Sequence, residues 1–357
     1  MEILDSLRGQ IDQLDDQILD LLAQRMRVVR QIGELKKQHN AIIYRPEREK
    51  SILDRLAARS QGTLLKPEAI DAIFMEIFAA SRYFELPERV AYLGPEGSFA
   101  HQAAESRFGQ ISDYIPLKNI RSVFESVTTE RVRFGVVPIE NNQEGFVRET
   151  IDFLHEMQVK IVAEILLPVH LTFVSTCDRL SDVRYIYSKD IAFKQCRNFL
   201  KEYFKDSAAE FVPVESTSRA AKMAAETPFS AAICASVAAK IYRVPILFEN
   251  IEDSPNNRTR FLIISKEFKN QKSGHDKTTL IVKLPDVAGS LAHFLQEFSQ
   301  AQINLNKIES RPAREDDNFK QWFYIELDGH FEDPALQQIF ARHGDRIRIL
   351  GSCVKLA

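Results

Sequence analysis

Residues 2–38 carry an apolar heptad, and this pattern constrains the fold more than any other feature of the chain. Apolar residues alternate at spacings of three and four, at Leu4, Leu7, Ile11, Leu14, Ile18, Leu21, Val28, Ile32 and Leu35. No proline interrupts the run, so we expect one helix of roughly 50 Å at ~1.5 Å per residue. That length exceeds what a small domain needs, and the helix can bury this row of apolar residues, its seam, against a partner.

Cations on this seam indicate a pocket for an anion. Arg25 occupies a seam position between Leu21 and Val28 where an apolar residue is expected. A register-setting or snorkelling side chain is the simpler interpretation. Lys36 follows Arg25 by roughly 16 Å on one face of the helix, within reach of one small anion. Arg8 lies ~25 Å from Arg25, so it could serve the same pocket only from an antiparallel second chain.

Two shorter helices are expected to follow, the later one over residues 67–85. Its apolar face ends with Ser81 and Glu85, while the helix before it offers Arg48 and Glu49. A pocket with several cations, one hydroxyl and two carboxyl groups suits a small dicarboxylate that also carries hydroxyl and ether oxygens.

Composition places the chain among ordinary multidomain globular proteins. Its 357 residues suggest two or three domains, and 47 basic against 50 acidic residues argue against bulk binding to nucleic acid. The four cysteines form no CxxC pair, so we expect a reduced, cytoplasmic protein. The N-terminus has no signal-peptide pattern and no stretch approaches ~18 apolar residues, so no membrane segment is expected.

Over residues 89–265 the pattern changes to short β-rich runs that alternate with helical stretches. This alternation indicates an α/β domain with a largely parallel sheet, in which residues 168–170 and 257–260 could be two crossings between two lobes. Residues 266–276 are polar and predict a linker. The order β-α-β-β-α-β over residues 277–357 predicts an α+β, ferredoxin-like domain.

Three short polar strings stand out in the α/β segment. GPEGSFAHQAA could present Ser98 and backbone N–H groups to a carboxylate, although helix caps look the same. GVVPIENNQEG places Glu140 and Asn141 just after a strand, a usual site of ligand contacts, with a polar turn as the alternative. NNRTRF puts Thr259 and Arg260 at the start of a strand, where a β-branched residue is common in any case.

The first segment resembles the all-helical chorismate mutases over residues 1–86, through LRGQIDQLDDQILDLLAQR, GELK and RPERE. That family rearranges chorismate to prephenate, a pericyclic step that needs conformer selection and charge stabilisation but no nucleophile. The resemblance implies that Lys36 and Glu85 face the ether oxygen and that Arg25 helps to hold the substrate. The full implied substrate-binding set is Arg8, Arg25, Lys36, Arg45, Arg48, Glu49, Ser81 and Glu85.

Glu85 stands where many members of that family carry glutamine. A carboxylate cannot donate a hydrogen bond to an ether oxygen, whereas a carboxylic acid can. We therefore expect Glu85 to be buried and protonated in the working enzyme, and mutase activity to fall as the pH rises.

GPEGSF, VPIEN and TRF, in this order, resemble prephenate dehydratases over residues 89–265. The resemblance implies two α/β lobes like those of periplasmic binding proteins, with the active site in the cleft. The reaction expels carbon dioxide and the ring hydroxyl from prephenate and gives phenylpyruvate, with Thr259 as the implied proton donor. The other implied catalytic and substrate-binding residues are Ser98, Glu140, Asn141, Gln195, Arg260 and Phe261.

LPDVAGSLAHFL and LNKIESRP resemble the ACT domain of phenylalanine-regulated dehydratases over residues 277–357. The resemblance implies that L-phenylalanine binds between paired ACT domains and inhibits the enzyme. The implied effector-binding residues are Gly289, Ser290, Leu291, Asn304, Glu309, Ser310, Arg311 and Pro312.

These patterns together predict an enzyme of phenylalanine biosynthesis with an isomerase and a carbon–oxygen lyase activity, working as a homodimer or a larger homo-oligomer. HExxH, GxGxxG and P-loop motifs are absent from the sequence, so no metal or organic cofactor is expected. Two alternatives stay open. One is a dehydratase, for prephenate or arogenate, whose helices only dimerise; the other is a non-catalytic regulatory protein that binds small molecules.

Overall fold

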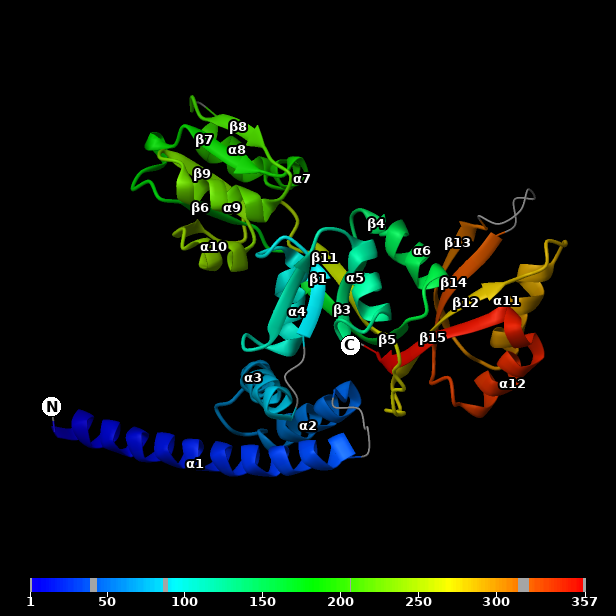
Figure 1. Ribbon diagram of the computed structural model, residues 1–357. Coiled ribbons are helices and arrows are strands. Elements are labelled where there is room, and N and C mark those ends of the chain that lie inside the picture. The colour runs from blue at the N-terminus through cyan, green and yellow to red at the C-terminus, as the bar shows by residue number, and fades with distance from the viewer. Residues whose placement is uncertain (1, 39–43, 86–88, 206, 314–320, 356–357) are drawn as a thin grey trace. The chain divides into compact units, whose positions relative to one another are not determined.

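The computed structural model describes residues 2–38, 44–85, 89–205, 207–313 and 321–355. The chain divides into two compact units (Figure 1). The first consists of Met1–Glu88 with Phe108–Asp113, and the second of Arg89–Arg107 with Tyr114–Ala357. Within the described ranges, none of the helices combines the length and the apolar character that a bilayer-spanning segment needs.

The first unit is built from three helices, α1 (Glu2–Gln38), α2 (Pro46–Arg59) and α3 (Pro67–Glu85). The bounds of α1 and α3 agree with the helices predicted from the apolar periodicity. Pro46 lies in the first turn of α2, where its missing N–H costs no hydrogen bond. α3 packs on the C-terminal part of α1, and the two come close at Gly33, where a β-carbon would lie 3.0 Å from the Cα of Glu85.

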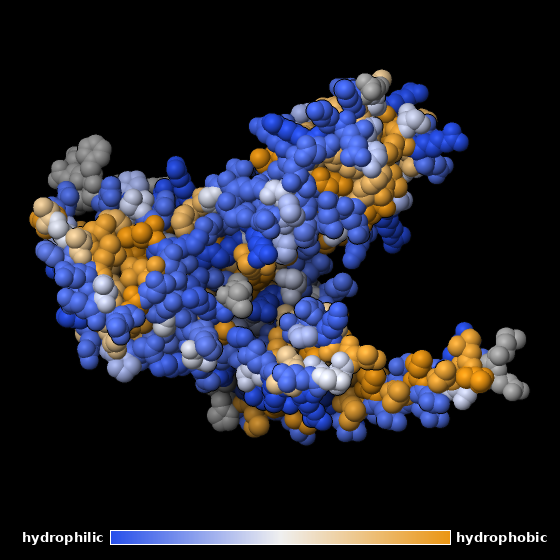
Figure 2. Space-filling view, turned by 180° about the vertical axis from the view of Figure 1, so that it is seen from behind, coloured by the Kyte–Doolittle hydropathy of each residue, from blue (hydrophilic) through white to orange (hydrophobic). Residues whose placement is uncertain are grey.

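Much of the apolar seam of α1 is uncovered in this chain. Leu4, Ile11 and Ile18 each expose more than half of their surface, whereas Val29, which faces α3, is buried. Figure 2 shows the apolar side chains gathered along the length of this helix. Because an amphipathic helix owes most of its stability to the packing of its apolar face, a seam of this length leaves a large stabilising contact unmade within one chain.

The first lobe of the second unit is a mixed sheet with strand order β2-β1-β3-β11-β5, to which β4 adds by pairing with β3. Its strands are β1 (Arg89–Leu93), β2 (Asp113–Leu117), β3 (Phe134–Asn141), β4 (Gly145–Phe146), β5 (Lys160–Pro168) and β11 (Arg258–Ser265). Its helices are α4 (Phe99–Phe108), α5 (Ile120–Thr128) and α6 (Arg148–Glu156). α5 and α6 bury Phe124 and Leu154 against Val137 and Leu262 of the central strands.

The second lobe is a five-stranded sheet with the order β10-β6-β9-β7-β8. Its strands are β6 (Thr172–Ser175), β7 (Tyr185–Ser188), β8 (Glu210–Pro213), β9 (Ser230–Cys234) and β10 (Ile246–Phe248). Its helices are α7 (Asp190–Gln195), α8 (Arg197–Phe204), α9 (Thr217–Glu226) and α10 (Ser236–Tyr242). The prediction of a two-lobed α/β region is thus confirmed.

The direction of the strands departs from the predicted largely parallel sheet. β1 is parallel to β3 and β7 is parallel to β8 and β9, but β11 runs antiparallel to both of its neighbours. The chain leaves the first lobe at the end of β5 and comes back in β11 at that same end of the sheet, where Arg258 pairs with Pro168, so β11 runs back along β5. The first crossing falls at residues 169–171, close to its predicted place, whereas Thr259 and Arg260 belong to β11 and not to the second crossing.

The C-terminal part is a four-stranded antiparallel sheet of order β13-β14-β12-β15 with two helices. Its elements are β12 (Asp276–Lys283), α11 (Ser290–Gln300), β13 (Leu305–Pro312), β14 (Gln321–Asp328), α12 (Pro334–His343) and β15 (Ile347–Val354). This order confirms the predicted ferredoxin-like arrangement. Trp322 and Tyr324 of β14 share one apolar cluster with Leu262 of β11, so the C-terminal sheet and the first lobe have a common core.

Candidate active and regulatory sites

Four of the residues predicted for the helical unit converge where α3 packs on α1. Arg25 donates a hydrogen bond from Nη1 to the Oγ of Ser81, which in turn donates to the backbone oxygen of Ile77 at 2.6 Å. The Nζ of Lys36 lies 2.7 Å from Oε2 of Glu85. Burial lowers the pKa of Arg25 and outweighs the nearby Glu85 carboxylate, which raises it. The two cations, the hydroxyl and the carboxyl group therefore form one polar cluster on an otherwise apolar contact.

The Glu85 carboxylate accepts a hydrogen bond from Lys36 in this structure. Only 11% of its side chain is exposed, as expected from the sequence. A carboxylate bound to an ammonium is an acceptor, so Glu85 can act as a donor only after it takes up a proton and Lys36 turns to a different partner.

The other residues predicted for this pocket either pair with different side chains or are exposed. Glu49 is buried and pairs with Arg82, a residue that sequence reasoning missed although an arginine inside the apolar third helix was a visible signal. Arg45 pairs with Glu47 on its own helix turn. The remaining two, Arg8 near the N-terminal end of α1 and Arg48 on α2, are exposed.

Thr259 and Asn141 lie opposite each other on the paired strands β11 and β3. The Oδ1 of Asn141 accepts hydrogen bonds from the backbone N–H groups of Gln143 and Glu144, at 2.9 and 3.2 Å. These two donors fix the orientation of the amide, so its NH₂ group faces Thr259 Oγ1 at 2.9 Å and Asn257 Oδ1 at 2.9 Å. Since Thr259 Oγ1 is thus an acceptor, its own proton remains available to another partner.

Gln195 links this pair to the second lobe. Its Nε2 donates to Oε1 of Gln143 at 3.2 Å, and the N–H of Gln143 in turn binds Asn141. Gln195 ends α7 in the second lobe, whereas Gln143 belongs to the turn between β3 and β4 in the first. The structure therefore brings Thr259, Asn141 and Gln195 together across the two lobes.

Glu140 and Arg260 were predicted for the same site, but their side chains turn to the opposite face of the sheet. Each is adjacent in sequence to a member of the Thr259–Asn141 pair, and successive residues of a strand point to opposite faces. Arg260 donates from Nη2 to Oε2 of Glu140 at 2.9 Å. The Arg260–Glu140 ion pair therefore lies on the face of the sheet opposite to the Thr259 hydroxyl and the Asn141 amide.

The two other residues predicted to bind substrate have structural contacts here. Ser98 caps α4: its hydroxyl donates to the backbone oxygen of Leu93 at 3.0 Å and accepts from the N–H of His101 at 3.2 Å. Phe261 is buried in the sheet next to Arg260. The capping interpretation of GPEGSF therefore accounts for the position of the Ser98 hydroxyl.

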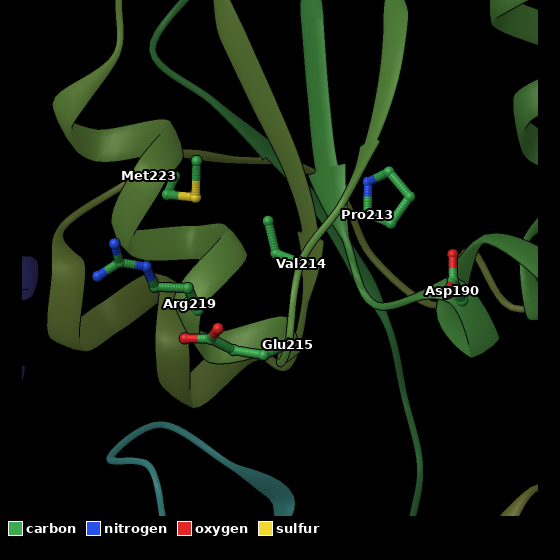
Figure 3. Close-up of a pocket in the computed structure, with 6 residues that line it drawn as sticks. All are labelled: Asp190, Pro213, Val214, Glu215, Arg219 and Met223. Atoms are coloured by element: carbon green, nitrogen blue, oxygen red, sulfur yellow. The ribbon is translucent and has the colours of Figure 1, made fainter.

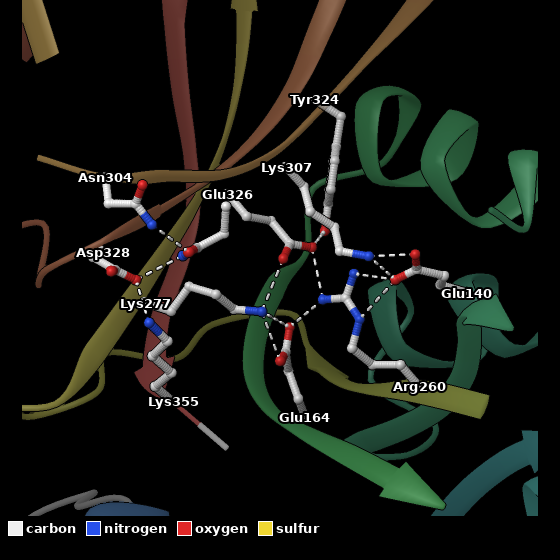
Figure 4. Close-up of polar contacts among 11 residues, drawn as sticks. Glu140, Glu164, Arg260, Lys277, Asn304, Lys307, Tyr324, Glu326, Asp328 and Lys355 are labelled. Carbon is white, nitrogen blue, oxygen red and sulfur yellow. Dashed lines mark hydrogen bonds and ion pairs between the residues drawn. The ribbon is translucent and has the colours of Figure 1, made fainter. Parts of the chain in front are cut away.

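The Arg260–Glu140 pair extends into a buried ion cluster that reaches the C-terminal sheet (Figure 4). Arg260 Nη1 lies 2.7 Å from both Glu164 Oε1 and Glu326 Oε1, and Lys277 Nζ contacts both of these carboxylates at 2.6–2.9 Å. Burial by itself lowers the pKa of Arg260, but the Glu164 and Glu326 carboxylates outweigh it and raise this pKa above its usual value. Burial likewise opposes the charge of Glu326, yet Lys277 and Arg260 hold its pKa below normal.

Sequence reasoning missed the partners in this cluster. Glu164 and Glu326 each stand inside an apolar strand, in KIVAEILLP and QWFYIELD. A charged residue within such a run was the available signal, because a buried carboxylate needs a cation nearby. The identity of that cation could not be predicted, since Lys277 lies 113 residues from Glu164 along the chain.

A polar pocket of about 430 Å³ opens in the second lobe, where β7 and β8 end (Figure 3). Its lining residues are Asp190, Pro213, Val214, Glu215, Arg219 and Met223. None of them was predicted as a site residue. In the part of the chain that the structure describes, no group of three or more His, Cys, Asp or Glu residues is placed to hold a metal ion.

The predicted effector residues occupy two parts of the C-terminal domain. Gly289, Ser290 and Leu291 begin α11, and Gly289 has a φ of +86° that a residue with a β-carbon adopts only under strain. Asn304 precedes β13, and Glu309, Ser310, Arg311 and Pro312 lie on β13, an edge strand of the sheet. Arg311 forms a two-pronged ion pair with Asp152 of α6 at 2.9 and 2.7 Å, a second polar link to the first lobe.

Three family models match successive parts of the chain. The model for chorismate mutase type II matches residues 7–86, the model for prephenate dehydratase matches residues 90–269, and the model for the ACT domain matches residues 278–344. The order of the three matches is the order of the three predicted segments.

Similarity to individual proteins extends over the whole chain. A bifunctional chorismate mutase/prephenate dehydratase of Aquifex aeolicus is 38% identical over 364 residues, which cover 99% of each chain. The prephenate dehydratase of Bacillus subtilis is 34% identical over 281 residues, covering 74% of this chain and 98% of that protein. The crystal structure of a prephenate dehydratase from Arthrobacter aurescens, in complex with L-Phe, has a TM-score of 0.67 and 32% identity, over 75% of this chain and 90% of that one.

Full-length similarity of this kind, together with the three folds, defines a multidomain enzyme in which an isomerase and a carbon–oxygen lyase are joined to an ACT regulatory domain. The chain belongs to the family of bifunctional chorismate mutases/prephenate dehydratases. It is therefore an enzyme of phenylalanine biosynthesis with both activities, as the sequence predicted, and the alternative of a non-catalytic regulatory protein is set aside.

Proposed function

We propose that Thr259 is the proton donor of the dehydratase step and that the cleft between the two lobes binds prephenate. In this step the bond to the ring carboxylate breaks and releases carbon dioxide. Its electron pair completes the aromatic ring while the ring hydroxyl departs and takes up a proton to leave as water. The protein's task is to supply that proton and to stabilise charge, because aromatisation itself drives the reaction.

The direction of the Asn141–Thr259 hydrogen bond is the observation that carries this proposal. Asn141 donates to Thr259 Oγ1 at 2.9 Å, so the threonine hydroxyl can donate its own proton to a ligand. The same N–H also stabilises negative charge as it develops on Oγ1, which makes the hydroxyl a better acid than a free threonine. Gln195, held at 3.2 Å from Gln143, would contact the substrate from the second lobe.

Substitutions at Thr259 and Asn141 test the direction of this bond. Thr259→Ala should lower dehydratase kcat by about 10²–10⁴-fold, whereas Thr259→Ser should keep part of the activity. Asn141→Asp should lose a similar amount, because a carboxylate at this position accepts the threonine proton and withdraws it from the substrate. Steady-state rates with prephenate measure the loss. The mutase rate of the same preparations should be unchanged, and full dehydratase activity in Thr259→Ala or Asn141→Asp would contradict the assignment.

For the mutase step we propose that the Arg25, Lys36, Ser81 and Glu85 cluster is the floor of the chorismate pocket. The rearrangement needs a folded substrate conformer and cations near the breaking ether bond, and no covalent participation. Lys36 would turn from Glu85 to the ether oxygen and a carboxylate, while protonated Glu85 donates to that same oxygen. Arg45, Arg48 and Glu49 would complete the pocket around the substrate carboxylates and hydroxyl.

The pH dependence of the mutase tests the role of Glu85. The acid form donates and the ionised form does not, so the mutase rate should fall as the pH is raised across the range in which the enzyme stays folded. Glu85→Gln keeps a donor at every pH and should flatten this decline. The measurement is kcat/KM for chorismate across the range, with the dehydratase rate recorded as the internal control. Identical pH profiles for the wild type and Glu85→Gln would contradict this role.

We further propose that the enzyme is a homodimer in which the α1 seam packs antiparallel against a second copy. The seam is largely exposed in a single chain, and Arg8 lies at its far end with 67% of its side chain exposed. Arg8 is ~25 Å from Arg25 along the helix, so an antiparallel partner is required to bring it into the pocket. Each pocket would then combine Lys36 of one chain with Arg8 of the other.

Mixing two inactive variants tests this shared pocket. Arg8→Ala and Lys36→Ala should each abolish most mutase activity as homodimers. After denaturation and refolding together, half of the dimers are hybrids, and each hybrid has one pocket with both residues intact. The mixture should therefore regain about a quarter of the wild-type mutase rate. No recovery in a mixture whose dehydratase activity is restored would contradict the arrangement.

We propose domain bounds of 1–86, 89–265 and 277–357 for the mutase, dehydratase and ACT domains. We also propose a cytoplasmic location, which is supported by four cysteines that are all free thiols.

L-phenylalanine is proposed as the feedback inhibitor, supported by the L-Phe complex of the similar Arthrobacter dehydratase. The effector would bind where Gly289–Leu291 and the Glu309–Pro312 end of the edge strand β13 meet a second ACT domain.

A further inference from the structure

Figure 4 shows a charge-balanced cluster of six charged residues. It begins at Arg260 and Glu140, which adjoin Thr259 and Asn141 on the paired strands β11 and β3. Its members are the dehydratase residues Glu140, Glu164 and Arg260 and the ACT-domain residues Lys277, Lys307 and Glu326. Buried charges are stable only when every one of them is paired, so the dehydratase strands and the ACT strands depend on each other here.

Two members of the cluster, Arg260 and Glu140, are the sequence neighbours of Thr259 and Asn141. Thr259 pairs with Asn141 across β11 and β3, and the next residues, Arg260 and Glu140, pair with each other on the opposite face. The strand register shifts between Arg260 and Phe261, which is the mark of a β-bulge. The regular ladder is therefore interrupted next to the site. Hydrogen bonds between Asn142 and Arg258 join the strand ends on one side of the Thr259–Asn141 pair, and the Arg260–Glu140 ion pair joins them on the side of the bulge.

Lys307 of the ACT domain contacts the Arg260–Glu140 ion pair through Glu140, the more exposed of its two members. Its Nζ contacts both carboxylate oxygens of Glu140. It also lies 5.2 Å from the ring centroid of Phe146, which packs edge-on against Tyr324 at 6.1 Å. Lys307 stands on β13, two residues before Glu309, on the strand that carries the proposed effector residues. A displacement of β13 therefore moves a charge that binds Glu140.

We propose that Lys307 of the ACT domain is a positioning residue for the dehydratase step. It holds the Glu140 carboxylate, Glu140 holds Arg260, and this pair fixes the approach of Asn141 to Thr259 on the other face of the sheet. This inference rests on the proposed role of Thr259, and it gives the ACT domain a direct contact through which its state alters the dehydratase rate.

Lys307 is also the member of the cluster best suited to substitution. About a third of its side chain is exposed, whereas Lys277 and Glu326 are almost completely buried. Removing either of those two would leave an unpaired charge in the interior and could unfold the domain. Lys160 offers a matched control, because its Nζ crosses the same interface to the backbone oxygen of Ile349 at 2.7 Å, far along β5 from the catalytic pair.

The test compares Lys307→Met, Lys307→Arg and Lys160→Met in the full-length enzyme. Lys307→Met should lower dehydratase kcat about 10-fold with little change in KM for prephenate, because the site is still formed but loosely aligned. Lys307→Arg should restore most of the rate, and Lys160→Met should behave as the wild type. The mutase rate and the thermal midpoint of Lys307→Met should stay close to those of the wild type.

Two results would overturn the proposal. One is a dehydratase kcat for Lys307→Met equal to that of the wild type. The other is a loss that Lys160→Met shares or that the mutase rate follows, because this reports a general weakening of the fold. The Thr259→Ala variant separates this inference from the proposed function: if Thr259→Ala stays active, the catalytic assignment fails, and if it is inactive while Lys307→Met is normal, only the positioning role fails.

Discussion

The pairing of buried charges around Arg260 is the constraint on which the second unit depends. Arg260 is buried and binds carboxylates from β3, β5 and β14, and Lys277 neutralises two of the same groups from β12. The desolvation of such charges is offset only when all partners are present. The dehydratase lobe and the ACT sheet therefore have to meet in one arrangement, which their shared apolar core also favours.

This constraint explains how the dehydratase site is built. Thr259 and Asn141 lie at paired strand ends, on the face of the sheet that meets Gln195 of the second lobe. The next residues, Arg260 and Glu140, lie on the face that meets the ACT sheet. In the proposed mechanism the Thr259 hydroxyl and the Asn141 amide carry the chemistry, and the ion pairs on the opposite face of the sheet keep them aligned. The helical unit is built differently, since Arg25 and Lys36 lie on a helix whose apolar residues are largely exposed in the single chain.

Much of this architecture could be predicted from local sequence. The three helices, the two lobes and the β-α-β-β-α-β order follow from periodicity and turn residues, which are read over a few neighbouring positions. The direction of β11 could not be predicted, because it depends on where the chain re-enters the first lobe. The sequence also does not tell on which face of the sheet Glu140 and Arg260 lie. A one-residue difference reverses the face of a strand residue, and only the neighbouring strands decide which face meets the ACT domain.

The proposed contacts make Lys307 and Glu140 act on Thr259 as one unit, and a double-mutant cycle measures the coupling between the two residues. Dehydratase kcat is determined for the wild type, Lys307→Met, Glu140→Gln and the double variant. We expect strong coupling, so that the double variant is no slower than Glu140→Gln alone. Losses that simply multiply in the double variant would show that the two residues act independently, and would rule out the positioning role of Lys307.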